Sequence, residues 1–186
     1  MKQVTITLFT ILFSLTVFSQ DDKKQKEPKH EIGLDILDFA EYKLSLSYNH
    51  LLNKKNSIGV NISIYDRYAS LGNMYSFYEV IGVDFNYKHY FSKNHTQGFY
   101  VESFAKYSFG QANDKYNENH HKYIDFNAIS LGLGIGYKHV FSNNLYINMN
   151  LQVSQNLNKP NLNLNNRYSS YPATFLHRGI SIGKRF

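Results

Sequence analysis

The 186-residue sequence contains no cysteine. No disulfide can therefore staple the fold, and no lipidated cysteine can anchor the chain as a lipoprotein. Beyond the N-terminal segment, no apolar run approaches the roughly 18 to 20 residues that a membrane-spanning helix needs. This argues against a helical membrane protein. It does not argue against a transmembrane β-barrel, because half of each barrel strand faces a polar interior.

The N-terminus has the features of a secretory signal peptide over residues 1–19. Lys2 is the positive region, residues 4–18 are apolar, and Val17 and Ser19 supply a small-residue cleavage site. A transmembrane anchor is the alternative, but an apolar run of about 15 residues is shorter than the ~20 that cross a bilayer. Residues 20–30 are polar and charged, and we expect a flexible periplasmic tail there.

Basic residues exceed acidic ones, with 20 Lys and Arg against 14 Asp and Glu. Lys2 is the one charged residue of the expected signal peptide, so the remainder has a net charge of +5. The charges are dispersed and a secreted protein rarely meets nucleic acid, so we predict no nucleic-acid partner. The basic residues are expected to face anionic lipid headgroups or to pair with acids.

Residues 31–186 alternate apolar and polar side chains in eight segments. Successive side chains of a strand point to opposite faces, so each segment predicts a strand with one apolar face. The expected strands are residues 31–37, 42–52, 58–65, 78–91, 99–109, 123–141, 145–154 and 175–186.

The expected connections alternate in length. Those after the second, fourth and sixth strands are short, whereas residues 66–77, 110–122 and 155–174 form long polar loops; the first outer connection, residues 38–41, is short. This asymmetry is typical of outer-membrane barrels. The sequence therefore predicts an all-β protein, an eight-stranded antiparallel up-and-down transmembrane β-barrel with both termini on the periplasmic side.

Three expected strands end in nearly the same sequence, at residues 48–53, 87–92 and 137–142. Side chains at i, i+2 and i+4 share one face, so aromatic residues gather where the strands meet the membrane interface. The last strand also stops on an aromatic residue. The predicted membrane-interface aromatics are Tyr48, Tyr87, Phe91, Tyr137, Phe141 and Phe186.

A soluble barrel, with its apolar face inward, has the same period and is the alternative fold. The polar face of residues 123–141 reads Ser-Gly-Gly-Gly, which suits a tightly packed interior better than a solvated surface. Aromatic bands also have no purpose in a soluble fold. We therefore favour the membrane barrel and keep a soluble periplasmic lipid-binding barrel as an alternative.

Several segments carry a family resemblance: Glu31-Ile-Gly-Leu, Leu-Ser-Leu-Ser-Tyr48-Asn-His, Ser57-Ile-Gly-Val-Asn, Gly98-Phe-Tyr-Val-Glu102 and Arg178-Gly-Ile-Ser-Ile-Gly-Lys-Arg-Phe186. Through them the chain resembles a family of small bacterial outer-membrane β-barrel proteins of unassigned function. The resemblance implies the barrel fold, the bacterial outer membrane with its lipid, and recognition of Phe186 by the barrel-assembly machinery. Lys184 departs from the usual apolar preference, but a lysine at headgroup level can snorkel.

Charges inside a barrel should pair, because an unpaired buried charge is costly. One alignment of two expected strands, with Tyr90 opposite Tyr100, sets opposite charges against each other twice. The ion pairs expected inside are Lys88–Glu102, Asp84–Lys106 and, at the closing seam, Glu31–Arg185. Such side chains fill an eight-stranded barrel, so we predict a plugged, non-conducting interior rather than a porin.

An outer-membrane lipid-modifying enzyme is a further alternative. A deacylase-like site would need His and Ser at i and i+2, but His89–Ser92 and His139–Ser142 have a spacing of three, which puts them on opposite faces. The adjacent His120 and His121 are expected to be solvated loop residues rather than metal ligands. We predict no enzyme, no catalytic residue, no cofactor and no metal, and a structural or surface-interaction role with an unidentified surface partner.

Overall fold

In the computed structural model, the described residues are 28–40, 43–65, 76–92, 96–113, 123–158, 161–164, 167–170 and 174–186. The expected signal peptide and most of the expected tail lie outside them, as do His120 and His121.

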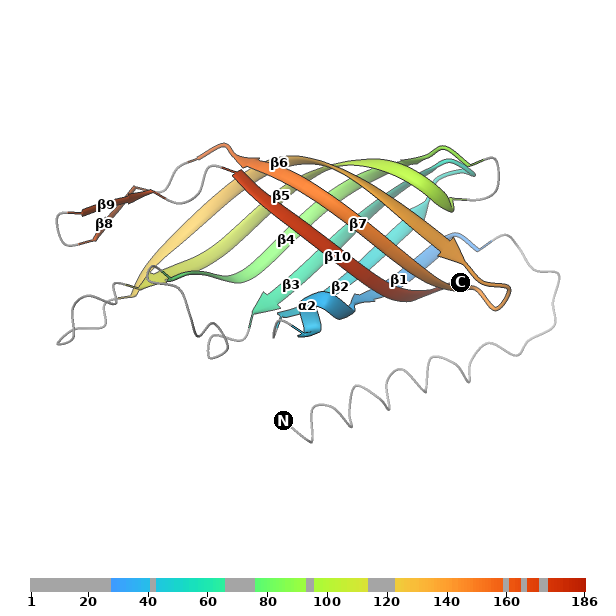
Figure 1. The fold of residues 1–186 in the computed structure, drawn as a ribbon, viewed down its shortest axis with the longest axis horizontal. Helices are drawn as coiled ribbons and strands as arrows, with labels where there is room; N and C mark the ends of the chain where they lie inside the picture. Colours follow the sequence, from blue (N-terminus) through green and yellow to red (C-terminus); the bar gives the residue numbers. More distant parts are fainter. Residues whose placement is uncertain are drawn as a thin grey trace, which may run out of the picture.

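The described residues form a closed barrel in the order β1-β10-β7-β6-β5-β4-β3-β2 (Figure 1). Its strands are β1 (His30–Asp35), β2 (Lys43–Leu51), β3 (Asn56–Tyr65), β4 (Ser76–Tyr90), β5 (Gly98–Asn113), β6 (Tyr123–Val140), β7 (Leu145–Asn156) and β10 (Thr174–Arg185). All neighbours are antiparallel, and β1 closes the wall against β10. The predicted eight-stranded, antiparallel, up-and-down barrel is confirmed. We call the end with the connections after β2, β4 and β6 the turn rim, and the opposite end the loop rim.

Two elements differ from the prediction. The first strand was expected to reach residue 37, but it ends at Asp35 and the short helix α2 (Ile36–Ala40) follows. The Asp35 carboxylate accepts the backbone N–H of Asp38 at 2.9 Å, as a helix N-cap does, and so turns the chain out of the strand. The expected loop 155–174 contains a hairpin, β8 (Asn161–Leu164) with β9 (Arg167–Ser170).

Among the described residues, no helix is long and apolar enough to cross a membrane.

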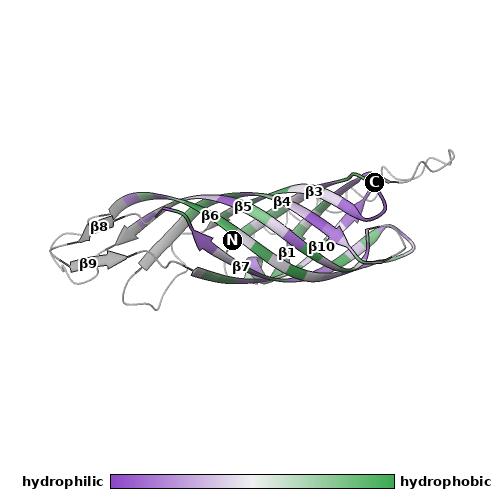
Figure 2. Cartoon of the chain, turned by 90° about the horizontal axis from the view of Figure 1, so that it is seen from above, coloured by the Kyte–Doolittle hydropathy of each residue, from purple (hydrophilic) through white to green (hydrophobic). Residues whose placement is uncertain are grey.

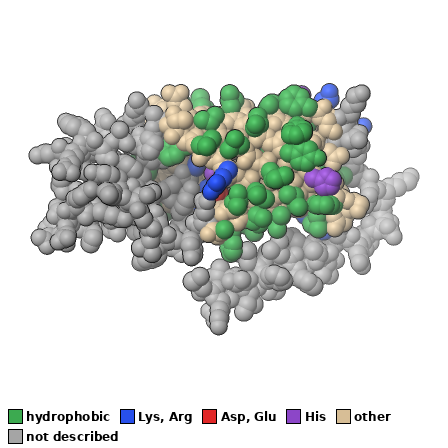
Figure 3. Space-filling model, viewed as in Figure 1, with side chains coloured by type: hydrophobic (Ala, Val, Ile, Leu, Met, Phe, Trp, Pro, Cys, Tyr) green, Lys and Arg blue, Asp and Glu red, His purple; other side chains and the backbone are tan. Residues whose placement is uncertain are grey.

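The wall is apolar outside and polar inside. Along β7, exposed and buried residues alternate almost without break, and the exposed set is Leu145, Ile147, Met149, Leu151, Val153 and, at the loop rim, Gln155. Figure 2 shows green and purple alternating along the strands, and Figure 3 shows hydrophobic side chains over much of the described face. A soluble barrel is expected to have its apolar face inward, and the observed polarity of the wall is the opposite. One departure is Arg178 of β10, which is exposed within the outward-facing row.

The inner face of β6 is built from small residues because its neighbour β5 presents large ones. Tyr100, Glu102 and Phe104 of β5 lie opposite Gly136, Gly134 and Gly132 of β6, in that order. A Cβ added at Gly136 would lie 2.4 Å from the Tyr100 ring, and one at Gly132 would lie 2.2 Å from the Phe104 ring. The expectation that this glycine row serves a packed interior is thus explained: the large side chains of β5 lie across β6.

We expect Gly136→Ala to destabilise the barrel by about 1–3 kcal/mol, because the added methyl group overpacks the interior. Urea unfolding of the protein in lipid vesicles measures the loss. Replacing Tyr100 by Leu in the same chain should recover part of it, because the ring that meets the methyl group is gone. Equal losses with and without the Tyr100 replacement would contradict this packing.

Candidate functional site

Three buried charged residues meet around Glu31 on β1, which is 1% exposed and is itself one of the three. Its Oε1 accepts from Arg185 Nη2 at 2.6 Å and Nε at 2.9 Å. Lys138 Nζ donates to Oε1 at 2.9 Å and to Oε2 at 2.8 Å. Arg185 comes from the neighbouring strand β10, whereas Lys138 reaches from β6. One carboxylate therefore binds two cations from two different parts of the wall.

A second layer surrounds these charges. Lys138 Nζ lies 4.6 Å from the ring centre of Tyr90 and 5.6 Å from that of Tyr146, within cation–π range. Arg185 Nη2 donates to the backbone carbonyl and to the hydroxyl of Thr96, at 3.1 and 3.0 Å. Thr96 has a φ of 37°, rare for a β-branched residue, and the bonds from Arg185 help to hold it there.

We call Glu31, Lys138, Arg185, Tyr90, Tyr146 and Thr96 the turn-rim cluster. All six residues are buried, so they fill the interior at this end of the barrel. The sequence predicts that Glu31 and Arg185 meet at the seam, and the structure places them so. It did not predict Lys138 as a partner, although a lysine on the polar face of the sixth expected strand was a sign that an acid inside the barrel binds it.

The hairpin of β4 and β5 has the predicted register. Tyr90 lies opposite Tyr100, Lys88 opposite Glu102, and Asp84 opposite Lys106. The Lys88–Glu102 contact is longer than expected, and both side chains also have amide partners.

Lys88 Nζ is 4.0 Å from Glu102 Oε2, beyond hydrogen-bond reach. Glu102 Oε1 instead accepts from Gln152 at 2.8 Å, while Lys88 donates to Asn49 at 3.4 Å. Asp84 accepts from Asn61 at 2.7 Å. The middle of the interior is therefore a polar network in which amide side chains bind the charged ones.

Some buried polar atoms of this middle layer lack a hydrogen bond. Glu102 Oε2 and both side-chain heteroatoms of Asn86 are buried without a hydrogen bond. Buried polar groups are normally paired with protein or with ordered water. The middle layer is thus less tightly satisfied than the turn-rim cluster, in which Glu31 uses both of its oxygens.

A smaller buried ion pair lies near the loop rim. Lys43 Nζ of β2 is 2.9 Å from Asp38 Oδ2 of α2, and the Ser45 hydroxyl donates to the same carboxylate. Asp38 and Lys43 are both buried. This contact ties α2 to the wall, and the sequence did not predict it because the helix itself was not expected.

The six predicted interface aromatics all lie on the outer face near the turn rim, 37–62% exposed: Tyr48, Tyr87, Phe91, Tyr137, Phe141 and Phe186. Histidines accompany them. His30 hydrogen-bonds Tyr48 at 2.7 Å and stacks on Phe186, while His89 and His139 make edge contacts with Phe91 and Phe141. The outer turn rim thus carries a band of rings that combine apolar faces with polar edges.

Within the part of the chain that the structure describes, no group of three or more His, Asp or Glu residues is arranged to hold a metal ion.

No family model matches the chain, and no curated protein matches it. Among solved structures, the chain is similar to the N-terminal β-barrel domain of Pseudomonas aeruginosa OprF. The similarity has a TM-score of 0.47 and 13% sequence identity, and it covers 87% of this chain and 100% of that chain. The family resemblance inferred from the sequence motifs stays a prediction.

We expect Glu31→Gln to cost about 3–5 kcal/mol of stability, because it leaves two buried cations without their carboxylate. Urea unfolding in vesicles measures the change. The matched control is Asp125→Asn, which alters an exposed carboxylate that accepts from Gln111 and should stay within about 0.5 kcal/mol of the wild type. Similar stabilities for the two variants would show that the turn-rim cluster does not hold the barrel together.

Proposed function

We propose that this protein is a small barrel of the bacterial outer membrane with a closed, non-conducting interior and a structural or surface-interaction role. The observation that carries the proposal is the polarity of the wall. Large apolar side chains cover the outside, while Glu31, Lys138, Arg185, Glu102 and Lys88 are buried inside.

The exposed apolar surface supports a membrane location. Soluble monomers rarely expose contiguous apolar patches larger than a few hundred Å². Here exposed Leu, Ile, Val and Phe side chains occur on every strand from β2 to β7, and the aromatic band borders them at the turn rim. In membrane barrels such a band marks the interface between hydrocarbon and water.

The turn-rim cluster supports a closed interior. A barrel of eight strands is just wide enough for its side chains to fill. Tyr90, Tyr100 and Tyr146 are at most 3% exposed. Tyr90 and Tyr146 pack beside Lys138, and Tyr100 packs against Tyr90. The cluster lies where a solute would have to leave the barrel at the turn rim.

At the other end, the β8–β9 hairpin supports the surface-interaction part of the proposal. Its two strands pair with each other as a separate two-stranded sheet and do not join the barrel wall (Figure 1). With the turn rim on the periplasmic side, this hairpin belongs to the outward-facing end.

We expect Leu133→Arg to destabilise the inserted barrel by about 2–4 kcal/mol, because it places a charge near the bilayer midplane. Leu157→Arg is the matched control. Leu133 and Leu157 are 65% and 63% exposed, but Leu157 lies beyond the end of β7. Leu157→Arg should destabilise the barrel by only about 0–1 kcal/mol, the usual cost of an arginine near the membrane interface. Equal costs in urea unfolding from vesicles would argue against a lipid-facing wall.

Ion conductance across planar bilayers tests the closed interior. With the full chain inserted, we expect no stable current steps, whereas a porin measured in the same bilayers provides the positive control. Insertion is checked separately by the shift in gel mobility between heated and unheated samples. A stable open current from inserted wild-type protein would contradict the plugged interior.

A further inference from the structure

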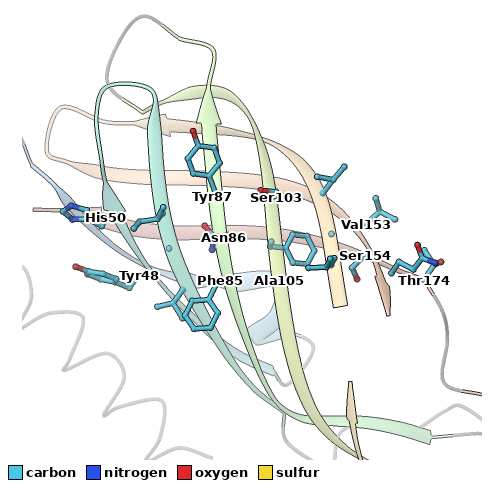
Figure 4. A pocket seen from close by; sticks show the side chains of 18 residues that line it. Tyr48, His50, Phe85, Asn86, Tyr87, Ser103, Ala105, Val153, Ser154 and Thr174 are labelled. Atoms are coloured by element: carbon cyan, nitrogen blue, oxygen red, sulfur yellow. The ribbon is translucent and has the colours of Figure 1, made fainter. Parts of the chain in front are cut away.

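A groove of about 1000 Å³ crosses the outer wall (Figure 4). Its lining runs over successive neighbouring strands, from Tyr48 and His50 on β2 to Gln155 on β7 and Thr174 on β10. That path has six strand-to-strand steps, or roughly 29 Å at ~4.8 Å a step. Tyr48 and His50 lie near the turn rim, and Thr174 begins β10 at the loop rim. We call this feature the lateral groove.

The floor of the lateral groove is made by small side chains on β5. Ala105 lies between Phe85 of β4 and Leu131 of β6 in the strand register. Phe85 is 66% exposed and Leu131 is 51% exposed, so both project outward on either side of a methyl group. The outer wall is therefore lowest at Ala105, between two taller side chains.

The next row repeats this arrangement. Ser103 lies between Tyr87 and Leu133, which is 65% exposed. Two successive rows thus combine large, small and large residues, and the lining is mainly apolar.

The turn-rim end of the groove is polar and basic. His50 lies 3.5 Å from His30, which in turn hydrogen-bonds Tyr48. Exposed Lys54 and Lys55 lie in the turn that follows β2.

Among the described residues at this rim, no exposed acidic side chain balances these lysines. Among the described residues at the turn-rim ends of the strands, the acid is Glu31, which is buried against Lys138 and Arg185. A mainly apolar groove that begins beside these basic residues has the polarity of an amphiphile with an anionic head.

We propose that the lateral groove binds a phospholipid with an anionic headgroup. One acyl chain lies over Ala105 and Ser103, and the headgroup phosphate lies at His50, Lys54 and Lys55. The inference rests on the proposed function, because only a barrel in a bilayer presents this wall to lipid. It goes beyond general lipid contact, since it assigns one lipid class to one site.

A second copy of the chain is the competing occupant, because a two-fold interface needs a self-complementary patch. The oligomeric state of the wild type and of the Ala105 variant distinguishes a second copy from a lipid.

Native mass spectrometry of the detergent-solubilised full chain tests the proposal. The probes are phosphatidylglycerol and phosphatidylcholine with identical acyl chains. We expect retention of phosphatidylglycerol over phosphatidylcholine by at least about fivefold, the preference that one lysine near an anionic headgroup gives. Lys54→Gln with Lys55→Gln should remove this preference.

The groove itself is tested by Ala105→Phe, which fills the floor and should release both lipids. Val83→Phe is the matched control, because Val83 lies on the outer face of β4, opposite Ile62 and Tyr107, outside the groove. The control should keep the wild-type preference.

Equal retention of the two lipids by the wild type would overturn the proposal. So would equal retention by the Ala105 and Val83 variants, or a wild-type dimer that Ala105→Phe dissociates. Insertion into vesicles is measured for every variant. Protein that inserts but retains no lipid overturns this inference alone, whereas wild-type protein that fails to insert overturns the proposed function as well.

Discussion

The closed wall depends most on the ion pairs that the buried carboxylate of Glu31 makes with Arg185 and Lys138. A barrel has no sheet edge only if its first strand pairs with its last, and Glu31 on β1 faces Arg185 on β10 at that seam. Removing these charges from water costs several kcal/mol for each ion, and good geometry with further hydrogen bonds must offset that cost. Lys138 supplies the second cation and donates to both carboxylate oxygens. The same contacts that close the wall also fill its interior.

The width of the barrel explains the residues around this cluster. Large inner side chains need space, and the neighbouring strand provides it by having glycine at the opposite position. Tyr146 on β7 shows this across the seam, because its hydroxyl lies 2.3 Å from the position of a Cβ at Gly33 and its ring lies 2.4 Å from one at Gly183. Gly33 and Gly183 are themselves register partners on β1 and β10. Substituting either glycine therefore disturbs the seam, the aromatic layer and the ion cluster together.

Much of the wall could be predicted from the sequence, because apolar and polar residues alternate along a strand that has one apolar and one polar face. Hairpin register was predictable where charges and aromatics matched, as with Tyr90 and Tyr100. The contact of Lys138 with Glu31 could not be predicted, because β6 and β1 are far apart in the sequence. Contact across the interior depends on the tilt and stagger of the closed barrel. Helix α2 could not be predicted either, because it begins at the Asp35 cap. The residues around that cap alternate in polarity and so also predict a strand. The β8–β9 hairpin did leave a short signal, the alternating Asn-Leu-Asn-Leu at residues 161–164.

The central claim is that the outside of this wall faces lipid and the inside faces a packed polar interior. Spin labels placed one at a time at residues 129–135 of β6, in protein reconstituted into vesicles, test it most directly. Collision with oxygen, which concentrates in the bilayer, should be high at Ile129, Leu131, Leu133 and Ile135 and low at the residues between them. A water-soluble nickel reagent should reach none of the four. The reverse pattern, or an accessibility with no period of two, would contradict the account.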